Sequence, residues 1–214
     1  MKLYDYYRSS SCYRVRIALN IKKMSYTTVP VHLLDNGGQQ HQASYTEINP
    51  QALVPTLNEN GHIITQSLAI IDYLDEISPH PPLLPQNPLD RSHVRSLALT
   101  IACDIHPLNN LRVLQTLKEQ FQATEEQVQG WYHHWLQTGF DAIETHLKHL
   151  RRKKPVCFGK EPTLADICLI PQVYNAKRFN FSMKDYPQIS EINDYCLTLP
   201  AFNLAAPETS IIIQ

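Results

Sequence analysis

The stretch from Asn49 to Leu74, NPQALVPTLNENGHIITQSLAIIDYL, contains the signals that decide the fold. Within it, an Asn-Gly pair at 60–61 separates two short runs of strand-forming residues, 54–57 and 62–65. An Asn-Gly pair between two such runs is typical of a tight β-hairpin. Residues 67–74 follow with a serine suited to capping a helix and with apolar residues at helical spacing. The stretch therefore predicts an antiparallel strand pair that leads directly into a helix.

Strand and helix signals alternate before this stretch. Lys2–Tyr7 predicts a short aromatic strand, and Thr27–Leu33 predicts a second, β-branched one. Between them Val15, Ala18 and Leu19 recur at helical spacing. A helix between two strands favours a parallel, right-handed crossover. The order β-α-β-α-β-β-α therefore predicts a mixed four-stranded sheet covered by helices, as in a thioredoxin-like domain.

Near residue 80 the sequence pattern changes from alternating strand and helix signals to helical signals. A run of prolines cannot sustain a helix or a central strand, and it predicts a stiff linker. These are Pro79, Pro81, Pro82, Pro85 and Pro88. We therefore expect a thioredoxin-like domain over 1–80, a proline-rich linker over 81–89 and an all-helical domain over 90–214. The predicted fold class is α/β followed by all-α.

Helical patterns fill the second half. Apolar spacing predicts one helix over 94–108, in which Pro107 should produce a kink and leave His106 and Asn110 on one face. Capping-box patterns predict further helices from about Thr124 to Leu150 and from Thr163 onward. A last helix is expected after Pro187, so this half should form a helical bundle.

Composition narrows the function classes. The chain has 214 residues, of which 43% are hydrophobic and 18% charged, with a formal net charge of −1. This content of hydrophobic residues excludes long disordered segments. The near-zero net charge argues against nucleic acid or an anionic membrane as the main partner. No apolar run approaches the about 20 residues that span a bilayer, and the N-terminus lacks the apolar core of a secretion signal. We expect a soluble cytoplasmic protein.

Cysteine and histidine spacing does not favour a metal site. The five cysteines are scattered without a C-x-x-C pair, which fits reduced thiols in a cytosol. His146 and His149 lie in a basic stretch that suits a solvated helix face. We expect no metal.

Three polar features converge on one end of the predicted sheet. Arg8–Arg14 surrounds the start of the first helix, where unpaired N–H groups and serine hydroxyls can stabilise a thiolate or simply cap the helix. Val54-Pro55 is either a proline at the start of an edge strand or a cis-proline turn in which the backbone N–H and C=O of Val54 face a bound peptide. Gln66-Ser67 can hold a carboxylate at a helix start or serve as a plain cap.

Several motifs together resemble zeta-class glutathione transferases and, more narrowly, the maleylacetoacetate isomerase family. The motifs are RSSSCYRVRIALN, LLDNGGQQ, NPQALVPTL, QSLAIIDYL, CDIHPLNN, TLADICLIPQVYNAKRF and YPQI. The resemblance extends from Lys2 to about Pro207. It implies the glutathione transferase fold, glutathione as cofactor, a homodimer, and isomerisation of 4-maleylacetoacetate to 4-fumarylacetoacetate in tyrosine and phenylalanine catabolism.

The same resemblance assigns roles to residues. Ser9, Ser10 and Ser11 would be catalytic, with Ser10 as the expected donor to the glutathione sulfur, and Arg8 and Arg178 would bind substrate carboxylates. The glutathione-binding positions carried over are Ser9, Ser10, Ser11, Cys12, Tyr13, Arg14, Gln40, Val54, Gln66, Ser67, His106, Asn110, Leu111 and Arg112. For Arg14 and Arg112 a surface ion pair is the alternative, and for His106 a satisfied interior histidine.

One departure from the family pattern concerns the motif cysteine. Many relatives carry it where this chain has Ser11, and here it comes one residue later, at Cys12. One position rotates a side chain by about 100° around a helix, so a packing role for Cys12 is favoured over catalysis. Three other functions stay open: a maleylpyruvate isomerase, a thiol reductase that uses Cys12, and a non-catalytic dimerising module.

Overall fold

The hairpin expected around the Asn-Gly pair is present in the computed structural model, which describes residues 1–150 and 152–210. Strands β3 (Thr56–Glu59) and β4 (His62–Thr65) pair antiparallel, with Glu59 opposite His62. Strand β1 (Lys2–Asp5) lies between β3 and β2 (Thr27–Pro30), antiparallel to β3 and parallel to β2. The order β2-β1-β3-β4 confirms the predicted mixed four-stranded sheet.

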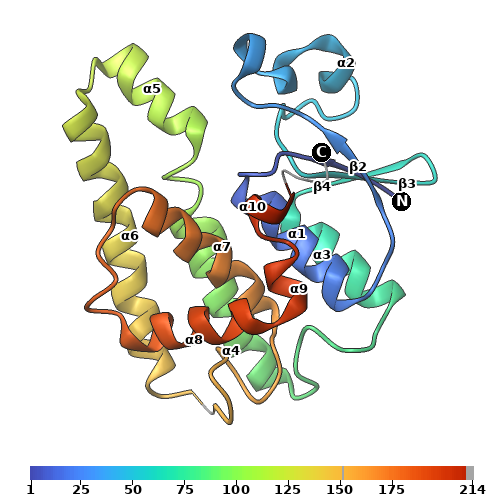
Figure 1. The fold of residues 1–214 in the computed structure, drawn as a ribbon, viewed down its shortest axis with the longest axis vertical. Helices are drawn as coiled ribbons and strands as arrows, with labels where there is room; N and C mark the ends of the chain where they lie inside the picture. Colours follow the sequence, from blue (N-terminus) through green and yellow to red (C-terminus); the bar gives the residue numbers. More distant parts are fainter. Residues whose placement is uncertain (151, 211–214) are drawn as a thin grey trace. The chain divides into compact units, whose positions relative to one another are not determined.

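Helices cover both faces of this sheet (Figure 1). Helices α1 (Ser10–Ile21) and α3 (Ser67–Ile77) pack against each other on one face. The short turns η1 (Asp35–Gly37) and η2 (Gln39–His41) and helix α2 (Ala43–Thr46) lie on the other side. A small core that includes Tyr45 of α2 joins Tyr6, Cys12, Val31, Tyr45 and Val54. The thioredoxin-like prediction is confirmed.

Three local predictions in this part were wrong. The first two strands end at Asp5 and Pro30, earlier than expected. The Ser9 N–H donates to the Tyr6 carbonyl at 2.8 Å, so the chain leaves β1 in a turn after Asp5. The edge strand β2, which pairs only with β1 in the described sheet, therefore ends at Pro30. Ser67 is the first residue of α3 and not its N-cap, because Gln66 at φ 70° turns the chain directly from β4 into the helix.

By their internal contacts the residues divide into two units, 1–82 with 197–210, and 83–196. The first unit thus includes the C-terminal helices α9 (Pro200–Asn203) and α10 (Pro207–Ser210), and α9 packs on α1. The expected boundaries assign residues 197–210 to the helical domain instead, and residues 211–214 of that domain lie outside the described part. The boundaries at 80 and 90 remain a prediction.

The second unit is helical, as predicted. Its elements are α4 (Pro88–Leu99), the π-helical turn η3 (Thr100–Ile105), α5 (Leu111–Phe121), α6 (Glu125–Leu147), α7 (Leu164–Arg178) and α8 (Pro187–Thr198). Helix α7 packs on α4 and η3 and is buried over most of its length. The capping boxes at Thr124 and Thr163 are both present, which confirms the predicted starts of α6 and α7.

Prolines shape two segments of this unit. Helix α4 begins at Pro88, inside the expected linker, since proline needs no N–H partner at the first helical position and Asn87 caps the next residues. The expected kinked helix over 94–108 instead ends in η3 at Ile105. A new helix, α5, starts after Asn110, so His106 and Asn110 do not share a helical face.

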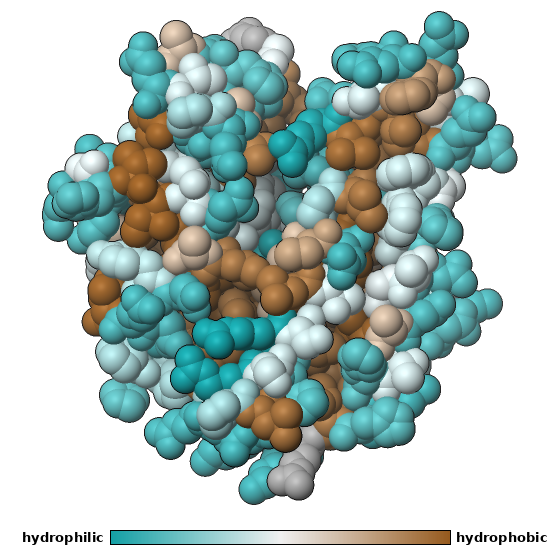
Figure 2. All heavy atoms as spheres, turned by 180° about the vertical axis from the view of Figure 1, so that it is seen from behind, coloured by the Kyte–Doolittle hydropathy of each residue, from teal (hydrophilic) through white to brown (hydrophobic). Residues whose placement is uncertain are grey.

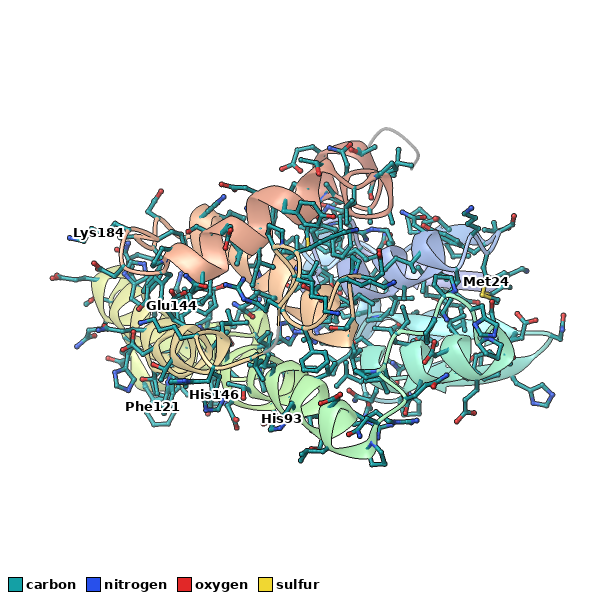
Figure 3. The ribbon with its side chains drawn as sticks, turned by 90° about the horizontal axis from the view of Figure 1, so that it is seen from below. Met24, His93, Phe121, Glu144, His146 and Lys184 are labelled. Carbon is teal, nitrogen blue, oxygen red and sulfur yellow. The ribbon has the colours of Figure 1, made fainter. Side chains whose placement is uncertain are left out.

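Several surface features of the helices follow the sequence pattern. His146 on α6 and His93 on α4 are exposed along the outer side of the helices, and Phe121 projects at the end of α5 (Figure 3). His149 is exposed as well, but it follows the end of α6 at Leu147 and so lies in a turn and not on the expected helix face. None of the helices in 1–150 and 152–210 has the length and apolarity needed to cross a membrane.

Candidate active site

The serine turn, residues 6–11, connects β1 to the start of α1. Ser9 is the N-cap: its Oγ accepts a hydrogen bond from the Cys12 N–H at 3.3 Å and lies 3.2 Å from the Ser11 Oγ. Ser10 is the first residue of the helix and is nearly buried. The turn therefore places three hydroxyl groups beside the positive end of the helix dipole, an arrangement that stabilises an anion.

The Val54-Pro55 turn lies against the serine turn. The peptide bond is cis, which confirms one of the two interpretations of the sequence. The Ser11 hydroxyl donates to the Val54 carbonyl at 3.3 Å. Two segments 43 residues apart in the sequence are thereby joined at the edge where the resemblance places the cysteinyl part of glutathione.

The start of α3 is joined to α1 by Arg14. The Nη1 of Arg14 donates to the Ser67 Oγ at 3.4 Å, and Arg14 is only 2% exposed. A surface ion pair is thereby excluded for this residue. Next to it, the Gln66 Nε2 donates to the Gln51 Oε1 at 2.9 Å. A helix N-terminus with a guanidinium at its first residue suits a carboxylate, such as the γ-glutamyl end of glutathione.

Gln40 is held in the turn before α2. It is 7% exposed, and its Nε2 donates to the Leu33 carbonyl at 3.3 Å. Its Oε1 is buried and accepts no hydrogen bond from the described residues. Buried amide oxygens normally have a donor, so Gln40 suits a peptide N–H. The anion-stabilising serine turn and the unused acceptor of Gln40 together fit a thiol-containing tripeptide.

Cys12 belongs to the small core and not to the site surface. Its side chain is 0% exposed, and its sulfur accepts a hydrogen bond from the Tyr6 N–H at 3.5 Å. Burial raises the pKa of the Cys12 thiol well above its ordinary value. This burial agrees with the favoured packing role, and the contact of Cys12 with glutathione that the resemblance implies remains a prediction.

Two aromatic residues that sequence reasoning did not single out flank Arg8. The Arg8 guanidinium carbon lies 5.8 Å from the ring centre of Tyr6 and 5.0 Å from that of Tyr7. Burial raises the pKa of Tyr6, although the nearby Arg8 opposes the shift. The adjacent pair Tyr6-Tyr7 before an arginine was the available signal. These rings fix a cation at the edge of the serine turn.

The remaining expected residues lie in the second unit. These are His106, Asn110, Leu111, Arg112 and Arg178. Asn110 caps α5 through its Oδ1, and Arg112 is exposed on that helix. Arg178 is exposed in the last turn of α7, where its guanidinium carbon lies 5.0 Å from the Phe179 ring centre. Their convergence with the serine turn remains a prediction.

A groove of about 680 Å³ in the second unit runs along α4 and η3. Arg91, Arg95 and Asp104 contribute to its lining, which contains none of the residues expected to bind glutathione or substrate.

Comparison with known proteins agrees with this geometry. Residues 3–82 match the glutathione S-transferase N-terminal domain family. The chain is 48% identical to a probable maleylacetoacetate isomerase of Vibrio cholerae over 96% of this chain and 95% of the relative. It is 42% identical to a maleylpyruvate isomerase of Ralstonia sp. over 97% of each.

A solved structure gives the same result for the fold. It is the maleylacetoacetate isomerase of Methylobacterium extorquens with bound malonate and glutathione, 37% identical, with a TM-score of 0.93 over 98% of this chain and 97% of that one. With identities of this size over nearly the full length, the chain belongs to the zeta class of glutathione transferases, in the maleylacetoacetate isomerase family.

Proposed function

We propose that the protein is a glutathione-dependent cis–trans isomerase that converts 4-maleylacetoacetate to 4-fumarylacetoacetate. The observation that carries the proposal is the serine turn: three hydroxyl groups at the start of α1, joined to the cis Val54-Pro55 turn by the Ser11–Val54 hydrogen bond. A zeta-class enzyme would hold the glutathione thiolate beside these hydroxyl groups. When bound, glutathione supplies the thiolate that adds reversibly to the cis C=C bond, so that this bond can rotate.

The residues of the first unit would hold the cofactor. Ser10, with the N–H groups at the start of α1, would stabilise the negative sulfur and so lower the pKa of the thiol. The Val54 backbone would pair with the cysteinyl backbone. Gln66 and Ser67, with Arg14 beside Ser67, would hold the γ-glutamyl end, and Gln40 would face the glycine end.

Arginines would place the substrate. The substrate carries two carboxylates, and a guanidinium can bind each of them with two parallel hydrogen bonds. Arg8 and Arg178 are the proposed partners. Arg8 is held by the rings of Tyr6 and Tyr7, and Arg178 by Phe179, so both cations have limited freedom before substrate binds. A cation near the substrate carbonyl also stabilises the enolate that forms in the transition state.

The direct test is an isomerase assay with purified protein. With glutathione present, 4-maleylacetoacetate should disappear and the trans product should accumulate, and omission of glutathione should abolish the conversion. Glutathione should also be recovered unchanged at the end of the reaction. Conversion without glutathione, or none with it, would refute the proposal.

A second candidate is a maleylpyruvate isomerase, which the 42% identical Ralstonia relative favours. The chemistry is parallel, because both substrates are cis-dicarbonyl acids. Assays of both substrates side by side decide between the two, and the physiological substrate should have the larger kcat/KM. A thiol reductase that uses Cys12 is disfavoured because that thiol is buried with a raised pKa.

The cellular setting is also proposed from the family: a cytoplasmic homodimer in tyrosine and phenylalanine catabolism. On the face in Figure 2, apolar surface reaches the solvent between hydrophilic side chains. Leu89 and Leu99 of α4 are among the exposed apolar residues, as a subunit interface requires. Light scattering should give twice the mass of one chain, and a single-chain mass would contradict the dimer.

A further inference from the structure

Arg16, on the second turn of α1, connects three separate segments of the first unit. Its Nη1 donates to the Asp5 Oδ1 at 2.6 Å, its Nη2 to the Tyr7 carbonyl at 2.8 Å and its Nε to the Ala205 carbonyl at 3.0 Å. The side chains of the Arg16–Asp5 pair are only 3% and 1% exposed. A buried guanidinium whose three nitrogens each meet an oxygen is fixed in one orientation.

The Tyr7 carbonyl belongs to the serine turn, two residues before the cap Ser9. The turn is closed on its other side by the hydrogen bond from the Ser9 N–H to the Tyr6 carbonyl. Arg16 therefore holds the N-terminal part of the serine turn through Tyr7, while the first residues of α1 hold its C-terminal part. Its guanidinium thereby sets the direction in which the three serines approach the sulfur site.

The Ala205 carbonyl belongs to the C-terminal segment, residues 200–210. Two more side chains of α1 donate to this segment: Tyr13 Oη to the Phe202 carbonyl at 3.3 Å, and Asn20 Nδ2 to the Ala201 carbonyl at 3.0 Å. Figure 1 shows α9 and α10 beside α1. Phe202 is fully buried, so the segment is anchored by packing as well as by hydrogen bonds.

We propose that Arg16 is a positioning residue for the serine turn, and that residues 200–210 hold Arg16 in place. The inference rests on the proposed function for its catalytic consequence. The effect is one of position, because Asp5 neutralises the charge of Arg16 at 2.6 Å. Arg16 acts on the reacting atoms indirectly, through the backbone of the serine turn, because its guanidinium donates a hydrogen bond to the Tyr7 carbonyl of that turn.

The test uses the full-length variant Arg16→Lys. Lysine keeps the positive charge beside Asp5 but lacks the planar fork that reaches three acceptors. In the glutathione-free variant, amide hydrogen exchange over residues 7–12 should be about ten-fold faster. The pKa of bound glutathione thiol should rise by about one unit, which lowers the ionised fraction of the thiol, and with it kcat, about two- to five-fold near neutral pH, while the KM for glutathione changes less than about 1.5-fold.

Two further variants keep the test decisive. Asn20→Ala removes one α1 contact to the C-terminal segment but keeps all three contacts of Arg16, so its exchange rates and thiol pKa should shift clearly less than those of Arg16→Lys. Phe202→Ala leaves the Arg16–Asp5 pair intact but loosens the segment, and it should change exchange and thiol pKa in the same direction as Arg16→Lys.

The outcomes separate this inference from the proposed function. Wild-type exchange and thiol pKa in Arg16→Lys would overturn the positioning role. If Arg16→Lys does not fold, Phe202→Ala decides: faster exchange with a raised thiol pKa supports the inference, and unchanged values overturn it. An un-ionised thiol in the wild-type complex would instead refute the proposed function. The comparison of amide hydrogen exchange between wild type and Arg16→Lys would still show whether Arg16 positions the serine turn.

Discussion

At the scale of single residues, the site depends on which side of α1 each side chain of the serine motif faces. Ser11 faces Val54 and donates to its carbonyl, whereas Cys12, one residue later, lies in the core. The rotation of about 100° per residue explains this difference. Cys12, the cysteine of this motif, is therefore buried rather than exposed beside the Ser11 hydroxyl, and we expect the reacting thiol to come from glutathione.

The cysteines provide a test at this scale. Cys103 is exposed and the other four are buried, and burial raises the pKa of Cys12, Cys157 and Cys196. We expect a thiol-alkylating reagent at neutral pH to modify Cys103 rapidly in the folded protein and the others only after unfolding. Peptide mass spectrometry identifies the labelled sites. Rapid labelling of Cys12 would contradict the core assignment and revive the reductase alternative.

Arg178 provides a second test. Arg178→Ala should raise the KM for the dicarboxylate about 10- to 100-fold, the effect of losing one hydrogen bond to a charged group, and should change the KM for glutathione much less. Lys177→Ala is the matched control, because Lys177 is the neighbouring exposed cation in the last turn of α7. Steady-state kinetics with each substrate varied in turn measures both constants. An equal rise in both would show that Arg178 does not place the substrate.

At the scale of elements, the sequence predicted the turns and helix starts that are determined by interactions between residues close together in the chain. The Asn-Gly hairpin and the two capping boxes were found because the hairpin's turn and each capping box are formed by residues within four positions of one another. The end of the helix at Ile105 was missed because a proline inside an apolar pattern is compatible with either a kink or a termination. Tertiary packing decides between them, here through the contact of η3 with α6.

That contact predicts opposite effects for two glycines of α6. A Cβ on Gly139 would lie 2.2 Å from the Cδ1 of Ile105, whereas a Cβ on Gly130 would meet no atom within 4 Å. Gly130→Ala should therefore raise the free energy of unfolding by about 0.5–1 kcal/mol. Gly139→Ala should lower it by about 1–3 kcal/mol because the core is overpacked.

Urea denaturation of both variants beside the wild type measures the two changes. If Gly139→Ala were as stable as Gly130→Ala, the close packing of η3 against α6 would be wrong. The pair controls for helix propensity, since both substitutions replace glycine by alanine inside the same helix.

At the scale of the whole molecule, the sequence carries little information on contacts between distant segments. The docking of residues 200–210 on α1 was not foreseen, because the acceptors are backbone carbonyls that any residue can provide. For the same reason Arg16 was not recognised, although a charged residue within an apolar helix was the available signal. The roles of Gln40 and Arg178 came from the resemblance alone, since no local chemistry distinguishes them.

The central claim is that the start of α1 holds the glutathione sulfur as a thiolate near neutral pH. Ultraviolet titration of the complex between protein and glutathione measures this directly, with Ser10→Ala as the comparison. The account predicts a thiol pKa in the wild-type complex well below that of free glutathione, and in Ser10→Ala a higher pKa with turnover reduced about 10- to 100-fold. A bound thiol that titrates like free glutathione would contradict it.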